Sequence, residues 1–223
     1  MNTYSFTWKG QELELLSQKA LLWKAESILI VADVHLGKSG HFRKHGIPVP
    51  DTVNNANLRL LSTLIEQYKP GRLIFLGDLF HSDPNEEWEE FAYWRSSWNS
   101  VDMLLTMGNH EIADVSDYSR IGLTCSNSIE LDPFVFVHDT EATPVTHTSL
   151  HPVQGHIHPA VLLKGQGRQY VRVPCFLFTE HRVLLPAFGS FTGSYLISPK
   201  ENEHTFAVAE DHVLPIHPKM ILK

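Results

Sequence analysis

The amino-acid sequence predicts an α/β fold built from two facing mixed sheets flanked by helices. Its first half alternates apolar, strand-like runs with helical segments, the order typical of β-α-β units. After residue 158 the sequence contains strand-like runs separated by turns, and no further helix is expected. No repeat, low-complexity tract or domain boundary interrupts the 223 residues, so we expect a single domain over residues 1–223.

The expected elements follow in order along the chain. Residues 4–24 alternate apolar and polar side chains in short pieces, which predicts antiparallel strands at a sheet edge. Apolar, mostly β-branched residues from Ile28 predict a buried strand, and helical spacing from Asp51, a suitable N-cap, to Tyr68 predicts a helix. The other elements expected before residue 158 are a strand at 72–77, an acidic helix with core-packing aromatic residues at 86–97, a strand at 102–107, paired strands at 128–137 and a polar loop at 139–152.

Composition limits the classes of function. The net charge is −7, which argues against a protein that holds duplex DNA by bulk electrostatics, although a local basic patch would suffice for catalysis. No run approaches the roughly 18 apolar residues of a membrane span, and the first residues lack the pattern of a signal peptide. Cys125 and Cys175 make no disulfide framework and are expected to pack as ordinary side chains. We therefore expect a cytoplasmic protein with no membrane partner.

Residue types that bind metals follow five of the apolar runs. The carboxyl ends of strands form the usual ligand-binding edge of an open α/β sheet, so these side chains are expected to gather there. Mixed oxygen and nitrogen donors suit a pair of divalent ions such as manganese, iron or zinc. The residues are Asp33 and His35, Asp78, Asn109 followed by His110, His138, and His156 with His158.

His138 is the candidate in this set with the closest competitors. It ends an apolar strand, as the other candidates do, whereas His147 and His151 lie in the polar segment that follows. This position favours His138 as the ligand. Asp132 and Asp139 are expected to face solvent rather than bind metal.

The ordered motifs carry a family resemblance. Asp33-Val-His35, Gly77-Asp78, the sequence GNHE at 108–111, the strand-end His138 and the sequence GHIH at 155–158 resemble the calcineurin-like metallophosphoesterases. The stretch HLGKSGHFRKHGIPVPD and the later LPAFGSFTG resemble the bacterial ligase-associated DNA-damage-response endonucleases. This resemblance implies a four-layer α/β/β/α sandwich and a metal-dependent phosphodiesterase, with DNA cleavage in repair as the expected activity.

The resemblance also implies roles for the candidate residues. Two metals about 3.5–4 Å apart lower the pKa of a bridging water and bind phosphate oxygens, and a carboxylate must bridge them. His110 would face the scissile phosphate, where it stabilises charge or protonates the leaving oxygen, oriented by Glu111 or Asp114. His81 is either a support for the site, a substrate contact or a solvated loop residue. The implied ligands are Asp78 as the bridge, Asp33, His35 and His158 in one site, and Asn109, His138 and His156 in the other.

A basic segment follows the first motif. Lys38, Arg43 and Lys44 are either a solvated surface or contacts for substrate phosphates, and the sequence leaves both open. The implied partners are DNA or another phosphodiester and, from the resemblance alone, repair proteins such as a ligase and a helicase. Two divalent ions are expected, with manganese favoured over iron or zinc.

Two other functions fit the same residues. A phosphodiesterase or phosphatase for small nucleotides would use the same metal ligands and would differ in the shape and charge of its surface. A scaffold without catalysis would be expected to lack some ligands, and the sequence has a suitable residue at every ligand position and at His110.

Overall fold

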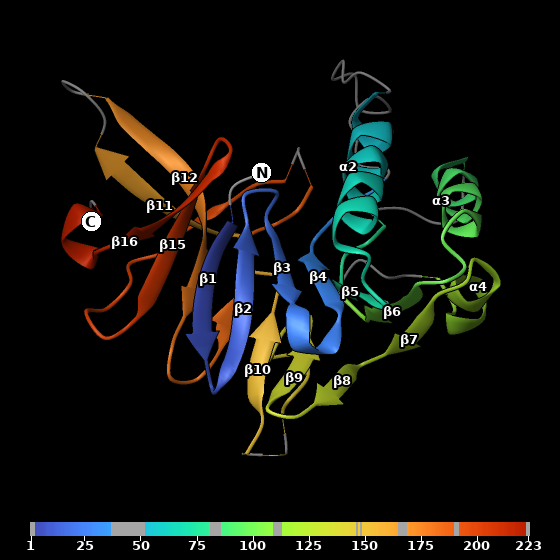
Figure 1. Cartoon of the computed structure of the whole chain (residues 1–223), viewed down its shortest axis with the longest axis horizontal. Helices are drawn as coiled ribbons and strands as arrows, with labels where there is room; N and C mark the ends of the chain where they lie inside the picture. The colour runs from blue at the N-terminus through green and yellow to red at the C-terminus, as the bar shows by residue number, and fades with distance from the viewer. Residues whose placement is uncertain are drawn as a thin grey trace.

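The computed structural model describes two β-sheets that face each other and helices that pack on one of them (Figure 1). The described residues are 3–36, 52–80, 86–108, 113–145, 147, 149–164, 169–189 and 192–221, with the side chains of 52–55 and 86 left out. None of the helices in these ranges is both long enough and apolar enough to cross a membrane.

The first sheet has seven strands in the order of the sequence. The strands up to β4 pair antiparallel, and those from β4 onward pair parallel. The parallel strands therefore end at one common edge. The seven strands are β1 (Thr3–Trp8), β2 (Gln11–Leu16), β3 (Ala20–Trp23), β4 (Ile28–Ala32), β5 (Arg72–Leu76), β6 (Asp102–Thr106) and β7 (Thr124–Ser126), with a 3-10 turn η1 (Lys24–Glu26) before β4.

The helices cover one face of this sheet. Alternate residues of β4 point to opposite faces, so Leu29 and Val31 pack with the helices while Ile28 and Ile30 pack toward the second sheet. The helices are α2 (Thr52–Tyr68), α3 (Glu86–Ser96) and α4 (Val115–Arg120), and they lie at the right of Figure 1.

The second sheet has nine strands, with the main order β14-β11-β12-β13-β10-β9-β8. Strand β15 pairs with the C-terminal half of β12, from Cys175 to Phe178, and β16 pairs with β15. The strands are β8 (Ser128–Leu131), β9 (Phe134–Val137), β10 (His151–Gln154), β11 (Pro159–Lys164), β12 (Tyr170–Phe178), β13 (Val183–Leu184), β14 (Tyr195–Leu196), β15 (His204–Ala209) and β16 (His212–Ile216), followed by a 3-10 turn η2 (Pro218–Met220).

An aromatic core fills the space between the sheets. Phe134, Phe136, Phe176 and Phe178 of the second sheet are buried against the inner face of the first. The chain also links the sheets directly, because Phe188 N–H donates to the carbonyl of Ala32 at 2.8 Å. These contacts bring the carboxyl ends of β4 and β5 close to those of β9 and β10.

The predicted two-sheet α/β fold is confirmed. The expected helices and the paired strands β8 and β9 are present, and the aromatic residues Trp88 and Phe91 are buried in the core as predicted. Cys125 packs half-buried against the core of the first sheet, and Cys175 is buried in the outer cluster of the second sheet. In the described ranges the α-helices all pack on the first sheet, and the outer cluster of the second sheet is formed by strand residues.

One expected loop is shorter than predicted. The polar segment predicted at 139–152 ends earlier, because His151 begins β10 and is only 6% exposed. Its ring packs edge-to-face on the indole of Trp8, with centroids 5.6 Å apart. Burial, assisted by repulsion from Lys9 and His181, lowers the pKa of His151 from 6.5 to about 4.

Because His151 is buried as a neutral ring, stability should depend on pH. In the unfolded chain this side chain takes up a proton below about pH 6.5, whereas in the folded protein it does so only near pH 4. We expect the free energy of unfolding to decrease as the pH falls through this window, by at most about 3 kcal/mol for this side chain. Melting temperatures measured between these pH values should fall less steeply for His151→Gln than for wild type. The exposed His147, changed to Gln, is the control, and equal slopes for the two variants would contradict the assignment.

Candidate metal centre

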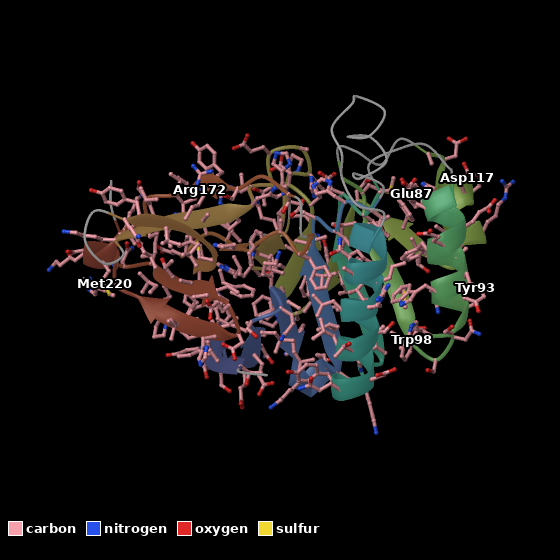
Figure 2. The ribbon with its side chains drawn as sticks, turned by 90° about the horizontal axis from the view of Figure 1, so that it is seen from above. Glu87, Tyr93, Trp98, Asp117, Arg172 and Met220 are labelled. Atoms are coloured by element: carbon pink, nitrogen blue, oxygen red, sulfur yellow. The ribbon has the colours of Figure 1, made fainter. Side chains whose placement is uncertain are left out.

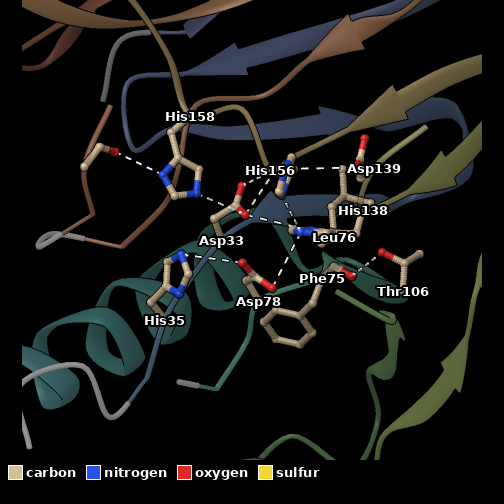
Figure 3. Close-up of polar contacts among 11 residues, drawn as sticks. Asp33, His35, Phe75, Leu76, Asp78, Thr106, His138, Asp139, His156 and His158 are labelled. Atoms are coloured by element: carbon tan, nitrogen blue, oxygen red, sulfur yellow. Dashed lines mark hydrogen bonds and ion pairs between the residues drawn. The ribbon is translucent and has the colours of Figure 1, made fainter. Parts of the chain in front are cut away.

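Aspartate and histidine side chains gather where the two sheets meet. Strand β4 ends just before Asp33, and β5 ends at Leu76, two residues before Asp78. From the second sheet, β9 ends directly before His138, and β10 leads through Gly155 to His156 and His158. With His35, which follows Asp33 by two residues, these side chains point toward one another where the sheets meet (Figure 3).

One group of metal-binding atoms is formed by Asp33, His35 and His158. The three ligand atoms lie within 4.8 Å of one another, and Asp33 Oδ1 is 3.2 Å from Nε2 of His158. The rings of His35 and His158 meet edge-to-face, with centroids 5.4 Å apart. These residues are those expected to share one metal site.

A second group is formed by Asp33, Asp78 and His138, with the same 4.8 Å limit. The two oxygens of Asp78 face different histidines: Oδ1 lies 3.5 Å from Nε2 of His138, and Oδ2 lies 3.9 Å from Nε2 of His35. Asp78, a member of the second group, thus also faces the first group through His35, as a bridging carboxylate must. Asp33 belongs to both groups, which makes it the alternative bridge.

Backbone carbonyls orient two of the histidines. Nδ1 of His138 lies 3.0 Å from the carbonyl of Leu76, and Nδ1 of His158 lies 3.0 Å from the carbonyl of Gly193. A carbonyl oxygen only accepts, so each Nδ1 carries the hydrogen and leaves the lone pair of Nε2 directed at the aspartates. Neutral imidazole with a free Nε2 is the form that binds metal ions. The donor set therefore fits divalent metal ions.

His156 joins the same cluster through its backbone and its ring. Its N–H donates to both oxygens of Asp33, at 3.2 and 3.0 Å, and its Nδ1 lies 3.1 Å from Nε2 of His138. On the other side of the ring, Nε2 lies 4.0 Å from Oδ2 of Asp139. His156 thus places one ring nitrogen toward the second group and the other toward a carboxylate.

The position of Asp139 corrects one expectation. This side chain was expected in solvent, yet it is buried beside His156, and its Oδ1 accepts a hydrogen bond from the N–H of Glu141 at 3.0 Å. A carboxylate behind a metal-ligating histidine fixes the orientation of the ring. Asp132, the other aspartate expected in solvent, is exposed as predicted.

The backbone is strained at the proposed ligands. Asp33, His35, Asp78, His156 and His158 all have a positive φ, between 46° and 64°. Residues other than glycine rarely adopt this left-handed backbone conformation. Such strain costs on the order of 1–3 kcal/mol for each residue and concentrates at functional sites. The surrounding sheets must hold these residues in place, which indicates that their geometry serves chemistry rather than stability.

A half-buried lysine supports the same edge. Nζ of Lys19, in the turn between β2 and β3, donates to the carbonyl of Gly189 at 3.3 Å, and Thr192 donates its hydroxyl to the same oxygen at 3.0 Å. The N–H of Gly189 in turn donates to the carbonyl of Asp33 at 3.2 Å. Burial lowers the pKa of Lys19 to about 8. Sequence reasoning missed this residue, because the turn carries no motif that points to the strand end.

The competing histidines lie elsewhere. His147 is exposed and pairs with Glu130 at 3.4 Å, and His151 packs on Trp8. Asp114 is exposed and directly precedes α4. The other predicted site residues fall outside the described ranges: Lys38, Arg43, Lys44, His81, Asn109, His110 and Glu111.

A family model decides what this cluster belongs to. The model of the calcineurin-like phosphoesterases matches residues 26–171, which contain all six clustered residues. The chain belongs to this family. It is a metal-dependent phosphoesterase, and the predicted fold class and enzyme class are confirmed.

Solved structures give a similar picture. The nuclease MPE from Pseudomonas putida is 29% identical to this chain with a TM-score of 0.80, covering 96% of this chain and 100% of the nuclease. The Escherichia coli phosphoesterase YfcE is 11% identical with a TM-score of 0.46, covering 85% of this chain and 98% of that protein. A Streptococcus pneumoniae TIGR4 protein described as a predicted phosphoesterase is 11% identical with a TM-score of 0.34, covering 88% and 91%. No curated protein sequence matches the chain.

Proposed function

We propose that this phosphoesterase is a dinuclear phosphodiesterase that cleaves DNA as an endonuclease. The observation that carries the proposal is the pair of donor groups that share Asp33, with Asp78 of the second group facing a histidine of each. The similarity of the whole chain to a nuclease supports polynucleotide cleavage over other phosphoester chemistry. A role in DNA repair, with a ligase and a helicase as partners, is part of the proposal and rests on the sequence resemblance.

The chain's own residues would hold and orient the reactants. Asp33, His35 and His158 form one metal site; His138, His156 and Asn109 form the other, with Asp78 between them. Divalent ions held there supply a nucleophile from water and neutralise charge on the phosphoryl group. From the sequence resemblance, His110 would face the phosphate and protonate the leaving oxygen. Asp139 lies 4.0 Å from the ring of His156, and carbonyl oxygens accept hydrogen bonds from the rings of His138 and His158.

Manganese is the favoured metal in this proposal, with iron or zinc as the alternatives. The described ligands combine carboxylate oxygens, which suit manganese, with imidazole nitrogens, which suit iron or zinc. Elemental analysis of protein purified without added metal identifies the bound ion.

The proposal is tested by comparing substrates side by side. Supercoiled plasmid, a cyclic dinucleotide and a simple phosphate monoester are incubated with the metal-free protein before and after addition of Mn²⁺. We expect plasmid nicking that needs the metal and disappears on chelation. Turnover of the cyclic dinucleotide or the monoester without plasmid cleavage would instead favour the small-nucleotide enzyme. Full activity after confirmed metal removal would contradict the metal mechanism itself.

A further inference from the structure

The strand hairpin formed by β11 and β12 begins at the metal centre. Strand β11 starts at Pro159, directly after the proposed ligand His158, and pairs antiparallel with β12. Strand β14 pairs with the other edge of β11, and the N–H of Tyr195 donates to the carbonyl of His158 at 2.9 Å. The hairpin is thus continuous with the candidate site.

The hairpin extends past the edge where the ligands gather. Strands β9, β10 and β13 are parallel to one another, and β12 is antiparallel to β13. Strand β12 therefore runs away from the metal-binding edge, and its first residues lie beyond that edge. Tyr170 and Arg172 are among these residues.

Three side chains of the hairpin share one face. In the register Lys164 lies opposite Tyr170, and Leu162 lies opposite Arg172, so alternation places Lys164, Tyr170 and Arg172 on the same side. Further along β12, Phe176 continues this side and packs in the core between the sheets. The three residues therefore extend the inner face of the second sheet, the face that bounds the candidate metal site.

These side chains are exposed and suited to a nucleic-acid strand. Tyr170 is 60% exposed, and Lys164 and Arg172 are exposed as well. An aromatic ring between two cations offers a base a stacking surface and gives phosphates two positive partners, in a chain whose net charge is −7. Arg172 also reaches toward the site, since its guanidinium donates to the carbonyl of Ser194 at 3.3 Å, next to the Gly193 that orients His158.

We propose that Lys164, Tyr170 and Arg172 form a docking surface for the substrate strand beside the metal centre. This inference rests on the proposed function and deepens it. A base that is not paired stacks on Tyr170, while the phosphates on either side of it lie against Lys164 and Arg172. Charge complementarity and continuity with His158 identify a polynucleotide as the occupant. The surface holds the strand while the phosphodiester at the metal centre is cleaved.

The surface is tested by binding rather than by cleavage. A fluorescent single-stranded oligothymidylate is titrated with the metal-free protein in chelator, and anisotropy gives Kd at several salt concentrations. Tyr170→Ala is expected to raise Kd about 5- to 150-fold, the usual effect of removing one stacking partner. Changing both Lys164 and Arg172 to Gln should reduce the salt slope by about 0.7 for each lost phosphate contact. Melting temperatures close to wild type show that the variants fold.

Matched controls lie at the other end of the molecule. Tyr93 is 81% exposed on α3, far from Arg172 in Figure 2, and Arg120 is exposed on α4. Tyr93→Ala and Arg120→Gln should leave Kd and the salt slope unchanged. If Tyr170→Ala binds the oligonucleotide with the same Kd as Tyr93→Ala, the proposed docking surface is contradicted.

The controls also separate this inference from the proposed function. If the wild-type protein nicks plasmid and the hairpin variants bind the oligonucleotide as tightly as wild type, only the docking surface is contradicted. A wild-type protein that neither binds the oligonucleotide nor cuts plasmid overturns the DNA substrate, and the surface with it. Equal loss of binding in the hairpin variants and in the controls would show a diffuse charge effect and contradict the assignment to these three residues.

Discussion

Asp78→Asn lowers phosphodiester turnover by at least about 10²–10³-fold, the usual cost of removing one stabiliser of the transition state. The loss is expected to be at least this large because the Asp78 carboxylate is the predicted bridge and faces a histidine of each group. Its oxygens lie 3.5 Å from Nε2 of His138 and 3.9 Å from Nε2 of His35. An amide keeps the shape of the side chain but replaces one anionic oxygen with a donor that binds no cation. Metal content and activity should therefore fall together.

Elemental analysis decides which aspartate is the bridge. We expect Asp78→Asn to lose both metals and Asp33→Asn to lose one, since Asp33 is predicted to bind in a single site. The reverse result would make Asp33 the bridge, as its presence in both groups allows. An inactive Asp78→Asn protein that keeps two metals would remove Asp78 from this role. The control is Asp117→Asn, on α4 and paired with Arg120, which should keep both metals and activity.

Much of the candidate site can be predicted from sequence because its residues are tied to strand ends. An apolar run that stops abruptly, as before Asp33 or His138, marks the end of a buried strand from local information alone. Parallel pairing then brings such ends to one edge, so the residues gather without any knowledge of packing. The same reasoning separates His138 from His147, which the structure leaves exposed beside Glu130.

Residues whose setting depends on distant segments could not be predicted in this way. Asp139 has the local sequence of a solvated loop, and it is buried because the ring of His156 arrives beside it from the next strand. His151 is likewise buried by Trp8, a residue of the first strand in the chain. Burial of a polar side chain is a tertiary property, and periodicity in the sequence does not record it.

One strand of the second sheet is shorter than its sequence indicates, for a related reason. The run from Arg182 to Phe188 has the composition of one strand, yet β13 contains only Val183 and Leu184. The chain then leaves the second sheet, and Ala187 makes a bridge with Ala32 of the first. Composition indicates that a segment is extended, whereas its choice of partner depends on both sheets.

Among substitutions of glycine by alanine at the site, Gly77→Ala should cause the largest loss of stability and metal binding. The backbone of Gly77 has a φ of +66°, and a Cβ added there would lie 2.2 Å from Nδ1 of His138. Alanine would therefore carry both the cost of a left-handed backbone and a direct overlap with a proposed ligand. Together these effects are expected to lower the free energy of unfolding by about 2–5 kcal/mol. The ring of His138 would also lose its hydrogen bond to Leu76, so metal binding at its group should fail.

Thermal unfolding in chelator tests the cause of this loss without any contribution from metal. Gly193→Ala is the control, because a Cβ there meets nothing within 4 Å although the residue touches His158. The double variant Gly77→Ala, His138→Ala removes the ring that the new methyl group overlaps, so it should be more stable than Gly77→Ala alone. If the double variant is no more stable, the loss comes from the backbone and not from His138. If Gly77→Ala melts and binds metal like Gly193→Ala, close packing of Gly77 against His138 does not hold the site together.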